Sequence, residues 1–360
     1  MDAVVNALPS YDRLFDSPTN MNASVAIESE KKWISVMRPI LSEEDFFTLM
    51  SLIMYAMLFV ALIGIVSNLL VLITCARIGF SETIHISYFA LGLSDLLTSV
   101  IRFYTSVLIL FEMTSTTLYF DSLIVTVIGI LPSQGFEKTS GFITAFIALE
   151  RCLCVQFPLH VKKMVTKRKT IFYNVIIYIF AFGPSNLIHI VYRLSLVFNA
   201  TLNRTILVVD HFEPQSFNVV LFGQVMYAYY GTILHFIALI IVWICTVFLV
   251  LGLKRKAVAR KENFKTSLIK EDKLKELRVM KTVFLLAVKY LVCSIPTAIT
   301  LLVPQFEPEF DSTRALTRIN RVSHMFSGLM MLMNSCTNFF IFLSMGSRFR
   351  QAFMRLFRKL

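Results

Sequence analysis

Charged residues are scarce in this chain of 360 residues, where Asp, Glu, Lys and Arg together make up 16%. Soluble domains carry about 25%, so the composition argues against a soluble protein. The six cysteines include no CxxC pair, and neither a zinc site nor a redox motif is expected. The six histidines include no HExxH-like pair, so we expect no enzyme. The N-terminus lacks a basic start followed by an apolar core, which argues against a cleavable signal peptide.

Hydrophobic residues are abundant instead: they make up 56% of the chain, and the mean hydropathy is +0.69. A helix that crosses a bilayer needs roughly 20 apolar residues. The segments that qualify are about 50–76, 84–111, 122–149, 171–192, 219–252, 280–303 and 320–345. The sequence therefore predicts an all-α membrane protein, a seven-transmembrane helix bundle with a short amphipathic eighth helix. We expect an N-terminal segment over 1–47, the bundle over 48–345 and the amphipathic helix over 346–360.

Lys and Arg are distributed unequally between the segments that connect these spans. With the N-terminus outside, the inner segments hold 22 basic residues and the outer segments eight. Positive charge favours the cytoplasmic side, so we expect a multi-pass plasma membrane protein with an extracellular N-terminus and a cytoplasmic C-terminus. This topology accounts for the net charge of +12 without a nucleic acid partner. Sequons in the outer segments predict glycosylation at Asn22, Asn199 and Asn203.

The C-terminal residues show an amphipathic pattern. Phe349, Phe353, Leu356 and Phe357 fall on one helical face, and arginines fall on the other. Such a pattern is typical of a helix that lies in the membrane interface, here beneath the inner leaflet. A disordered basic tail is the alternative.

Ionisable residues inside the predicted spans are costly, at about 2.5–3.5 kcal/mol each on insertion scales. They are Asp95, Arg102, Glu137, Lys138, Lys289 and Arg321. A long basic side chain can extend along its helix to water or pair with another residue. We expect Lys289 and Arg321 to do one or the other, whereas Asp95 lies too deep in its span to reach water.

Six short motifs follow one another along the spans: GIVSNLLVL with Asn68, LGLSDLLTS with Asp95, ALERCLCVQFPL, CSIP ending at Pro296, NSCTNFFIF and FRQAF. Over about residues 50–358 the chain resembles the rhodopsin-like (class A) G protein-coupled receptors. The stretch ERCLCVQFPLHVKK also resembles divergent invertebrate, mollusc-type chemosensory receptors and some neuropeptide receptors. The resemblance implies a receptor that binds an extracellular small chemosensory molecule or neuropeptide. Such a receptor activates a heterotrimeric G protein by movement of helix six.

The sequence departs from that family at several positions. Ser294 replaces the Trp of the sixth-helix motif, and Phe339 and Phe342 replace the Pro and Tyr of the seventh. Thr126 stands where the family has the helix-three cysteine of its outer disulfide, and residues 193–217 contain no cysteine. That bridge cannot form, so we expect the second outer loop to be held by packing or glycans, or to be mobile.

The resemblance implies that Arg151, at the inner end of helix three, is a conformational switch. Glu150 and Glu276, an acid at the start of helix six, would hold it in the resting state, and Pro296 and Asn338 belong to the same activation set. Agonist binding would tilt helix six, release Arg151 and open a cleft for the G protein. A partly buried ion pair is weak evidence for stability but a sensible switch element. A plain interfacial charge pair is the alternative.

The same resemblance gathers five oxygen-bearing residues at one depth of the bundle: Asp95, Ser140, Asn334, Ser335 and Asn338. One carboxylate with several neutral oxygens suits a monovalent cation, and the family binds sodium there. The sequence thus predicts that a sodium ion could bind here, and no other cofactor is expected. A hydrated polar network without an ion is the alternative.

Arg102, Ser133 and Glu137 are the predicted ligand-binding residues in the outer half of the bundle. Arg102 could grip the carboxylate of an amino acid, a small acid or a peptide terminus with a bidentate guanidinium. Alternatively, Arg102 and Glu137 form a structural pair. Ser133 stands where amine receptors carry Asp, and Leu332 stands where opsins carry the retinal-binding Lys. Neither a biogenic amine nor retinal is therefore expected.

A membrane transporter is the alternative function. Transporters often show internal repeats and helices broken by Gly or Pro at matching positions, and the sequence shows neither. A channel would need a selectivity filter or a ring of charges, which is not evident. The prediction is therefore a receptor in the lipid bilayer.

Overall fold

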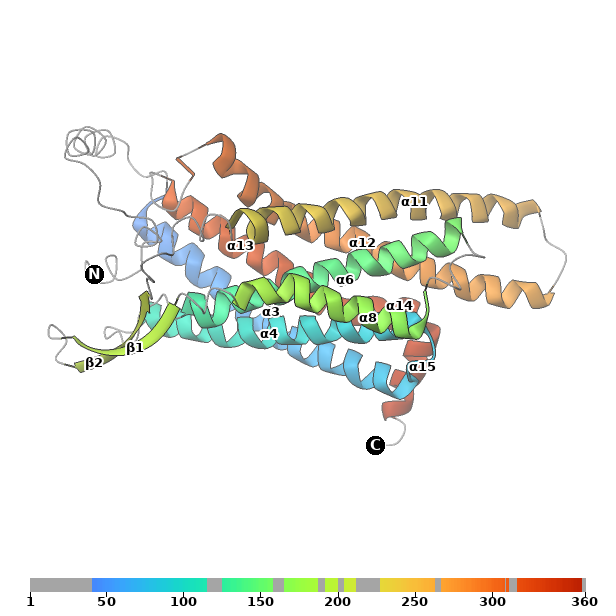
Figure 1. The fold of residues 1–360 in the computed structure, drawn as a ribbon, viewed down its shortest axis with the longest axis horizontal. Helices are drawn as coiled ribbons and strands as arrows, with labels where there is room; N and C mark the ends of the chain where they lie inside the picture. The colour runs from blue at the N-terminus through green and yellow to red at the C-terminus, as the bar shows by residue number, and fades with distance from the viewer. Residues whose placement is uncertain are drawn as a thin grey trace.

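The computed structural model describes residues 41–114, 125–157, 165–186, 192–199, 204–211, 227–262, 267–307, 309–310 and 316–357. Its helical segments, in chain order, are α3 (Glu43–Ile78), α4 (Thr83–Thr114), η2 (Thr126–Ile130) with α6 (Leu131–Gln156), α8 (Lys167–Ile177) with η3 (Tyr178–Phe182) and η4 (Gly183–Asn186), η5 (Tyr227–Ile233) with α11 (Leu234–Glu262), α12 (Ser267–Phe306), α13 (Thr317–Cys336) with α14 (Asn338–Met345), and α15 (Ser347–Phe357). Each predicted span contains a helix, and the long helices run side by side (Figure 1).

Five of the described helices are long and apolar enough to cross a membrane: Glu43–Ile78, Thr83–Phe111, Gly231–Gly252, Arg278–Phe306 and Thr317–Ser344. The third and fourth predicted spans are less regular. Two adjacent charged residues lower the apolar character of α6. The fourth segment changes from α to π and 3-10 geometry after Ile177. Both segments nevertheless pack against the apolar helices of the bundle.

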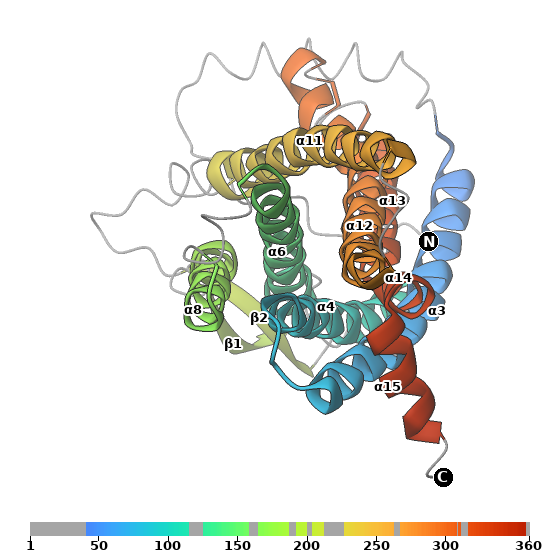
Figure 2. The same cartoon turned by 90° about the vertical axis from the view of Figure 1, so that its right-hand side faces the viewer.

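The helix α6 lies at the centre of the bundle (Figure 2). It packs against α4, α11, α12 and the η3 turn, whereas α8 lies on the outside against α4 and η3. The helix α3 packs against α4 and α13. Because α6 has neighbours on several sides, its ionisable side chains are placed between helices.

A β-hairpin that the sequence did not predict lies in the segment expected to be an outer loop. Strands β1 (Tyr192–Asn199) and β2 (Arg204–His211) pair antiparallel in one continuous register. Both strands are rich in β-branched and large apolar residues, which favour extended structure. None of the six cysteines forms a disulfide, so the ladder of backbone hydrogen bonds orders this segment without one. We call the end of the bundle that carries the hairpin the hairpin end (Figure 1).

The helix α15 lies at the opposite end, which we call the α15 end (Figure 1). Phe349 is buried there and packs against Phe342 and Phe339, and Phe353 contacts Phe339 edge-on. Arg350, Met354 and Arg355 are exposed on the other side. The predicted amphipathic helix is therefore confirmed, and a disordered tail is excluded over Ser347–Phe357. The side chain of Phe357 lies outside the described part of the chain.

One close helix contact at the α3–α4 interface depends on a glycine. A Cβ on Gly64 would lie 2.4 Å from Ser99 Oγ and 3.0 Å from Ser99 Cβ. Small residues let membrane helices approach this closely, and extra volume in a packed contact costs about 1–3 kcal/mol. We therefore expect Gly64→Ala to lower the midpoint of thermal unfolding of the purified protein. The control is Gly183→Ala, since a Cβ there meets nothing within 4 Å; equal midpoints for the two variants would contradict the close contact.

Candidate functional site

Three polar layers lie along the inside of the bundle. Arg102 and Glu137 form the layer nearest the hairpin end, Asp95 and its neighbours form the middle layer, and Glu150 with Arg151 forms the layer at the α15 end. In each layer, at least one side chain of one helix contacts a side chain of another helix. The layers therefore link the helices in the same regions where the sequence predicts ligand binding, ion binding and switching.

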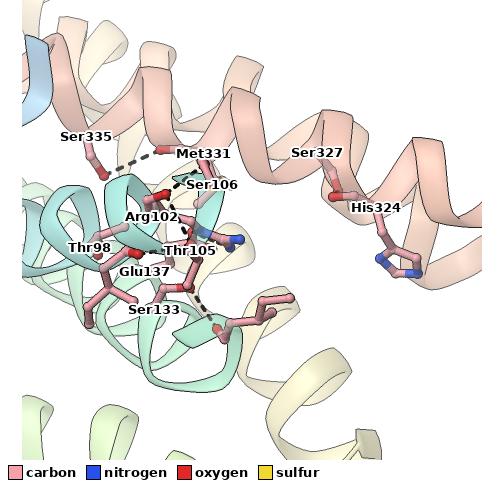
Figure 3. A network of polar contacts seen from close by, with 12 residues as sticks. Thr98, Arg102, Thr105, Ser106, Ser133, Glu137, His324, Ser327, Met331 and Ser335 are labelled. Carbon is pink, nitrogen blue, oxygen red and sulfur yellow. Dashed lines mark hydrogen bonds and ion pairs between the residues drawn. The ribbon is translucent and has the colours of Figure 1, made fainter. Parts of the chain in front are cut away.

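In the first layer, Arg102 of α4 and Glu137 of α6 form a buried ion pair (Figure 3). The Nη2 and Nε atoms of Arg102 lie 2.8 and 3.1 Å from one oxygen, Oε1, of Glu137. The side chains are only 6% and 10% exposed. Gly328 of α13 lies on the other side of the guanidinium, since a Cβ built on it would be 3.6 Å from the Arg102 nitrogens. The arginine is thus enclosed by three helices.

Two further polar residues of α6, Ser133 and Lys138, lie near this layer and have other partners. The hydroxyl of Ser133 is fully buried and donates to the Ile130 carbonyl at 2.7 Å. Lys138 follows Glu137 in sequence but points to a different neighbour, and its Nζ donates to the Gly231 carbonyl of η5 at 3.3 Å. Consecutive residues on a helix do not share a face. The adjacent charges of α6 therefore serve two different interfaces.

The middle layer brings the five predicted cation ligands to one region. Asp95 is fully buried, and the Nδ2 of Asn338 donates to its Oδ2 at 2.5 Å. The hydroxyls of Ser140 and Ser335 lie beside the same carboxylate. The oxygens Asp95 Oδ1, Ser140 Oγ and Asn334 Oδ1 are buried without a hydrogen-bond partner among the described residues. The structure therefore brings Ser140, Ser335 and Asn338 to the carboxylate of Asp95.

Lys289 of α12 enters this middle layer, so of the two expected alternatives it pairs inside the bundle and does not extend to water. Its Nζ donates to the backbone carbonyl of Asn334 at 2.6 Å and to Oδ1 of Asn338. The ammonium also interacts electrostatically with Asp95. A lysine near the middle of a span satisfies its charge more cheaply on polar groups inside the bundle than by a long path to water. The sequence signal for this role was the presence of one acid and one lysine inside the predicted spans, and Asn338 of the seventh segment connects them.

This arrangement bears on the predicted sodium ion. The oxygen atoms that an ion needs are present, but the single carboxylate is already connected to a buried cation, Lys289, through the amide of Asn338. A further positive charge would be buried without a negative partner, which is strongly unfavourable. The residues therefore do not fit a sodium ion in the presence of Lys289.

The third layer lies at the α15 end of α6. Glu150 Oε1 accepts hydrogen bonds from Arg151 Nη2 and from Thr83 Oγ1, both at 2.5 Å. The Glu150 side chain is fully buried, and that of Arg151 is 17% exposed. Thr83 begins α4, and its part in this layer was missed because a threonine at a helix start carries no pairing signal. The contact therefore joins α6 to α4.

Two of the predicted switch residues lie in α12. Pro296 lies inside that helix, which continues through it to Phe306. Glu276 also lies in α12, but its side chain is outside the described part of the structure, so its contact with Arg151 stays a prediction. For the predicted glycosylation sites, Asn22 and Asn203 fall outside the described residues, and Asn199 ends β1 with its side chain not described.

Helices in each of the seven predicted spans, an amphipathic eighth helix and an acid–arginine pair at the end of the third span together define a seven-transmembrane receptor. Residues 55–359 match the family described as serpentine type 7TM GPCR chemoreceptor Srw. The match covers most of the chain, and the protein belongs to this family of G protein-coupled chemoreceptors. A search of curated proteins found no matching relative.

Proposed function

We propose that this chemoreceptor binds an extracellular small molecule or peptide in the hairpin-end half of the bundle and activates a heterotrimeric G protein at the α15 end. The observation that carries the proposal is the contact of Glu150 with Arg151 and Thr83. It places a partly exposed arginine beside a buried acid at one end of the bundle. Such a pair can be released by a small change in helix packing, which is what a two-state switch requires.

The proposal includes the orientation of the receptor in the membrane and the type of receptor. The receptor has an extracellular N-terminus in the plasma membrane and carries glycans at Asn22, Asn199 and Asn203. The excess of basic residues at the ends of the spans assigned to the cytoplasm supports this orientation. The motif pattern supports a rhodopsin-like receptor with a likeness to mollusc-type chemosensory receptors, and a neuropeptide ligand is the second candidate.

Nucleotide exchange tests the receptor function directly. Membranes that contain the full-length protein and a panel of G proteins are incubated with small metabolites and neuropeptides, and binding of a non-hydrolysable GTP analogue is measured. We expect one ligand class to raise exchange above that of membranes without the receptor. A transporter would instead accumulate labelled ligand in sealed vesicles without any effect on nucleotide exchange, and that pair of results would overturn the proposal.

A further inference from the structure

The middle layer around Asp95, which we call the Asp95 cluster, contains its own cation. Within the described part of this layer, the carboxylate of Asp95 supplies the negative charge and the ammonium of Lys289 the positive charge. The amide of Asn338 stands between them: its Oδ1 accepts from Lys289, and its Nδ2 donates to Asp95. The two charges are therefore joined through one neutral side chain inside the bundle.

The helix of the seventh segment is interrupted where it contacts the ammonium of Lys289. The helix α13 ends at Cys336, and α14 begins at Asn338. The last carbonyls of a helix have no partner within that helix, and the carbonyl of Asn334 is one of them. It accepts from Lys289 Nζ at 2.6 Å and from Thr337 Oγ1 at 3.2 Å. The C-terminal end of a helix attracts positive charge, so the end of α13 attracts the ammonium.

These contacts occupy oxygens that an ion would otherwise use. We propose that the Lys289 side chain is a tethered cation that takes the place of a sodium ion in the Asp95 cluster. The receptor then needs no dissolved ion to neutralise Asp95. Because Lys289 belongs to α12, a movement of α12 relative to α13 and α14 changes the position of the charge relative to Asn338 and Asp95. The inference rests on the contacts inside the bundle and not on the proposed ligand or G protein.

The first test compares two salts. The purified full-length receptor in detergent is unfolded by heat in sodium chloride and in choline chloride, each at about 150 mM so that screening is equal. We expect the same midpoint temperature in both salts, since a ligand that does not bind the folded state cannot stabilise it. A higher midpoint in sodium would show that an ion binds beside Lys289 and would overturn the proposal.

The second test removes the tethered cation. In Lys289→Met, Asn338 Oδ1 is released and joins Asp95 Oδ1, Ser140 Oγ and Asn334 Oδ1 as open oxygens, and the Asn334 carbonyl keeps only Thr337 Oγ1 as a donor. We expect this variant to gain a midpoint temperature that rises with sodium concentration and not with choline. Adding Asp95→Asn should remove the gain. The matched control is Lys138→Met, which removes the ammonium that donates to the Gly231 carbonyl. Its midpoint temperature should not change with sodium.

If Lys289→Met shows no sodium response, Lys289 does not hold the place of an ion, and the proposal is wrong. If that variant yields no folded protein, Lys289→Gln is measured instead, because its amide retains hydrogen bonding without the charge. Ligand-induced nucleotide exchange plays no part in these measurements. Failure here is therefore distinct from failure of the receptor function.

Discussion

Replacing Arg102 alone by methionine should destabilise the receptor strongly and lower the amount that reaches the cell surface. The substitution would leave the carboxylate of Glu137 buried between α4 and α6 without its partner. Breaking one side of a buried ion pair typically costs about 3–5 kcal/mol. The measurement is the midpoint of thermal unfolding of the purified protein, supported by surface labelling in cells.

The double variant Arg102→Met with Glu137→Met separates charge from packing. Replacing both partners of a buried pair by apolar residues is often neutral or stabilising, so we expect stability near that of the parent. The exposed pair of Arg348 and Glu82 provides the control, because its side chains are 57% and 45% exposed. Surface pairs contribute about 0–1 kcal/mol, and Glu82→Ala should change the midpoint little. A double variant as unstable as the single one would show that shape and not charge governs this position.

The same variants test the ligand hypothesis once an agonist is known. If the pair is structural, the double variant should keep the agonist potency of the parent. If Arg102 binds an anionic group of the ligand, the double variant should reach the surface and lose potency by about tenfold or more, equivalent to roughly 1.4 kcal/mol. The observed enclosure of the guanidinium by α4, α6 and α13 favours the structural result.

Substituting Glu150 by glutamine should raise agonist-free signalling. The amide keeps an oxygen that can accept from Thr83 and Arg151 but loses the negative charge. Hydrogen bonds to charged groups are worth about 1 kcal/mol more than neutral ones, and a change of that size shifts the ratio of active to resting receptor roughly five- to tenfold. The measurement is nucleotide exchange without ligand, at matched surface expression.

Two further variants make this result specific. Thr83→Val removes the second donor to Glu150 and should raise basal exchange by a smaller factor, since only a neutral hydrogen bond is lost. Glu82→Gln, at the residue next to Thr83, removes an exposed charge of the same kind and should leave exchange unchanged. Basal exchange in Glu150→Gln equal to that of the parent would contradict a restraining role for the contact.

The positions of polar residues along the helices followed from local spacing, but most of their partners did not. Glu137 and Lys138 are neighbours in sequence, and the helical repeat predicts that they point in different directions. Which helix each side chain meets depends on the place of α6 in the bundle. Arg102 and Glu137 could be matched by depth alone, because both lie at a similar distance along antiparallel helices.

The β-hairpin was not predictable from the local sequence of either strand. Its strands carry the β-branched and apolar residues of extended structure, but such residues are equally common in the membrane spans on either side. The register from Tyr192 paired with His211 to Asn199 paired with Arg204 is a property of the two strands together. Neither strand can satisfy its backbone hydrogen bonds alone, so the hairpin exists only through that pairing.

The sequence by itself determined the helical membrane bundle, the amphipathic α15 and the residues that supply its polar layers, because hydrophobic length and helical period are local properties. Only the tertiary structure decided that Lys289 turns into the bundle and that Thr83 completes the contact of Glu150. A lysine side chain can extend several ways from its helix. Its direction is set by the polar groups that neighbouring helices bring within reach, and here the end of α13 and the amide of Asn338 bring those groups to α12.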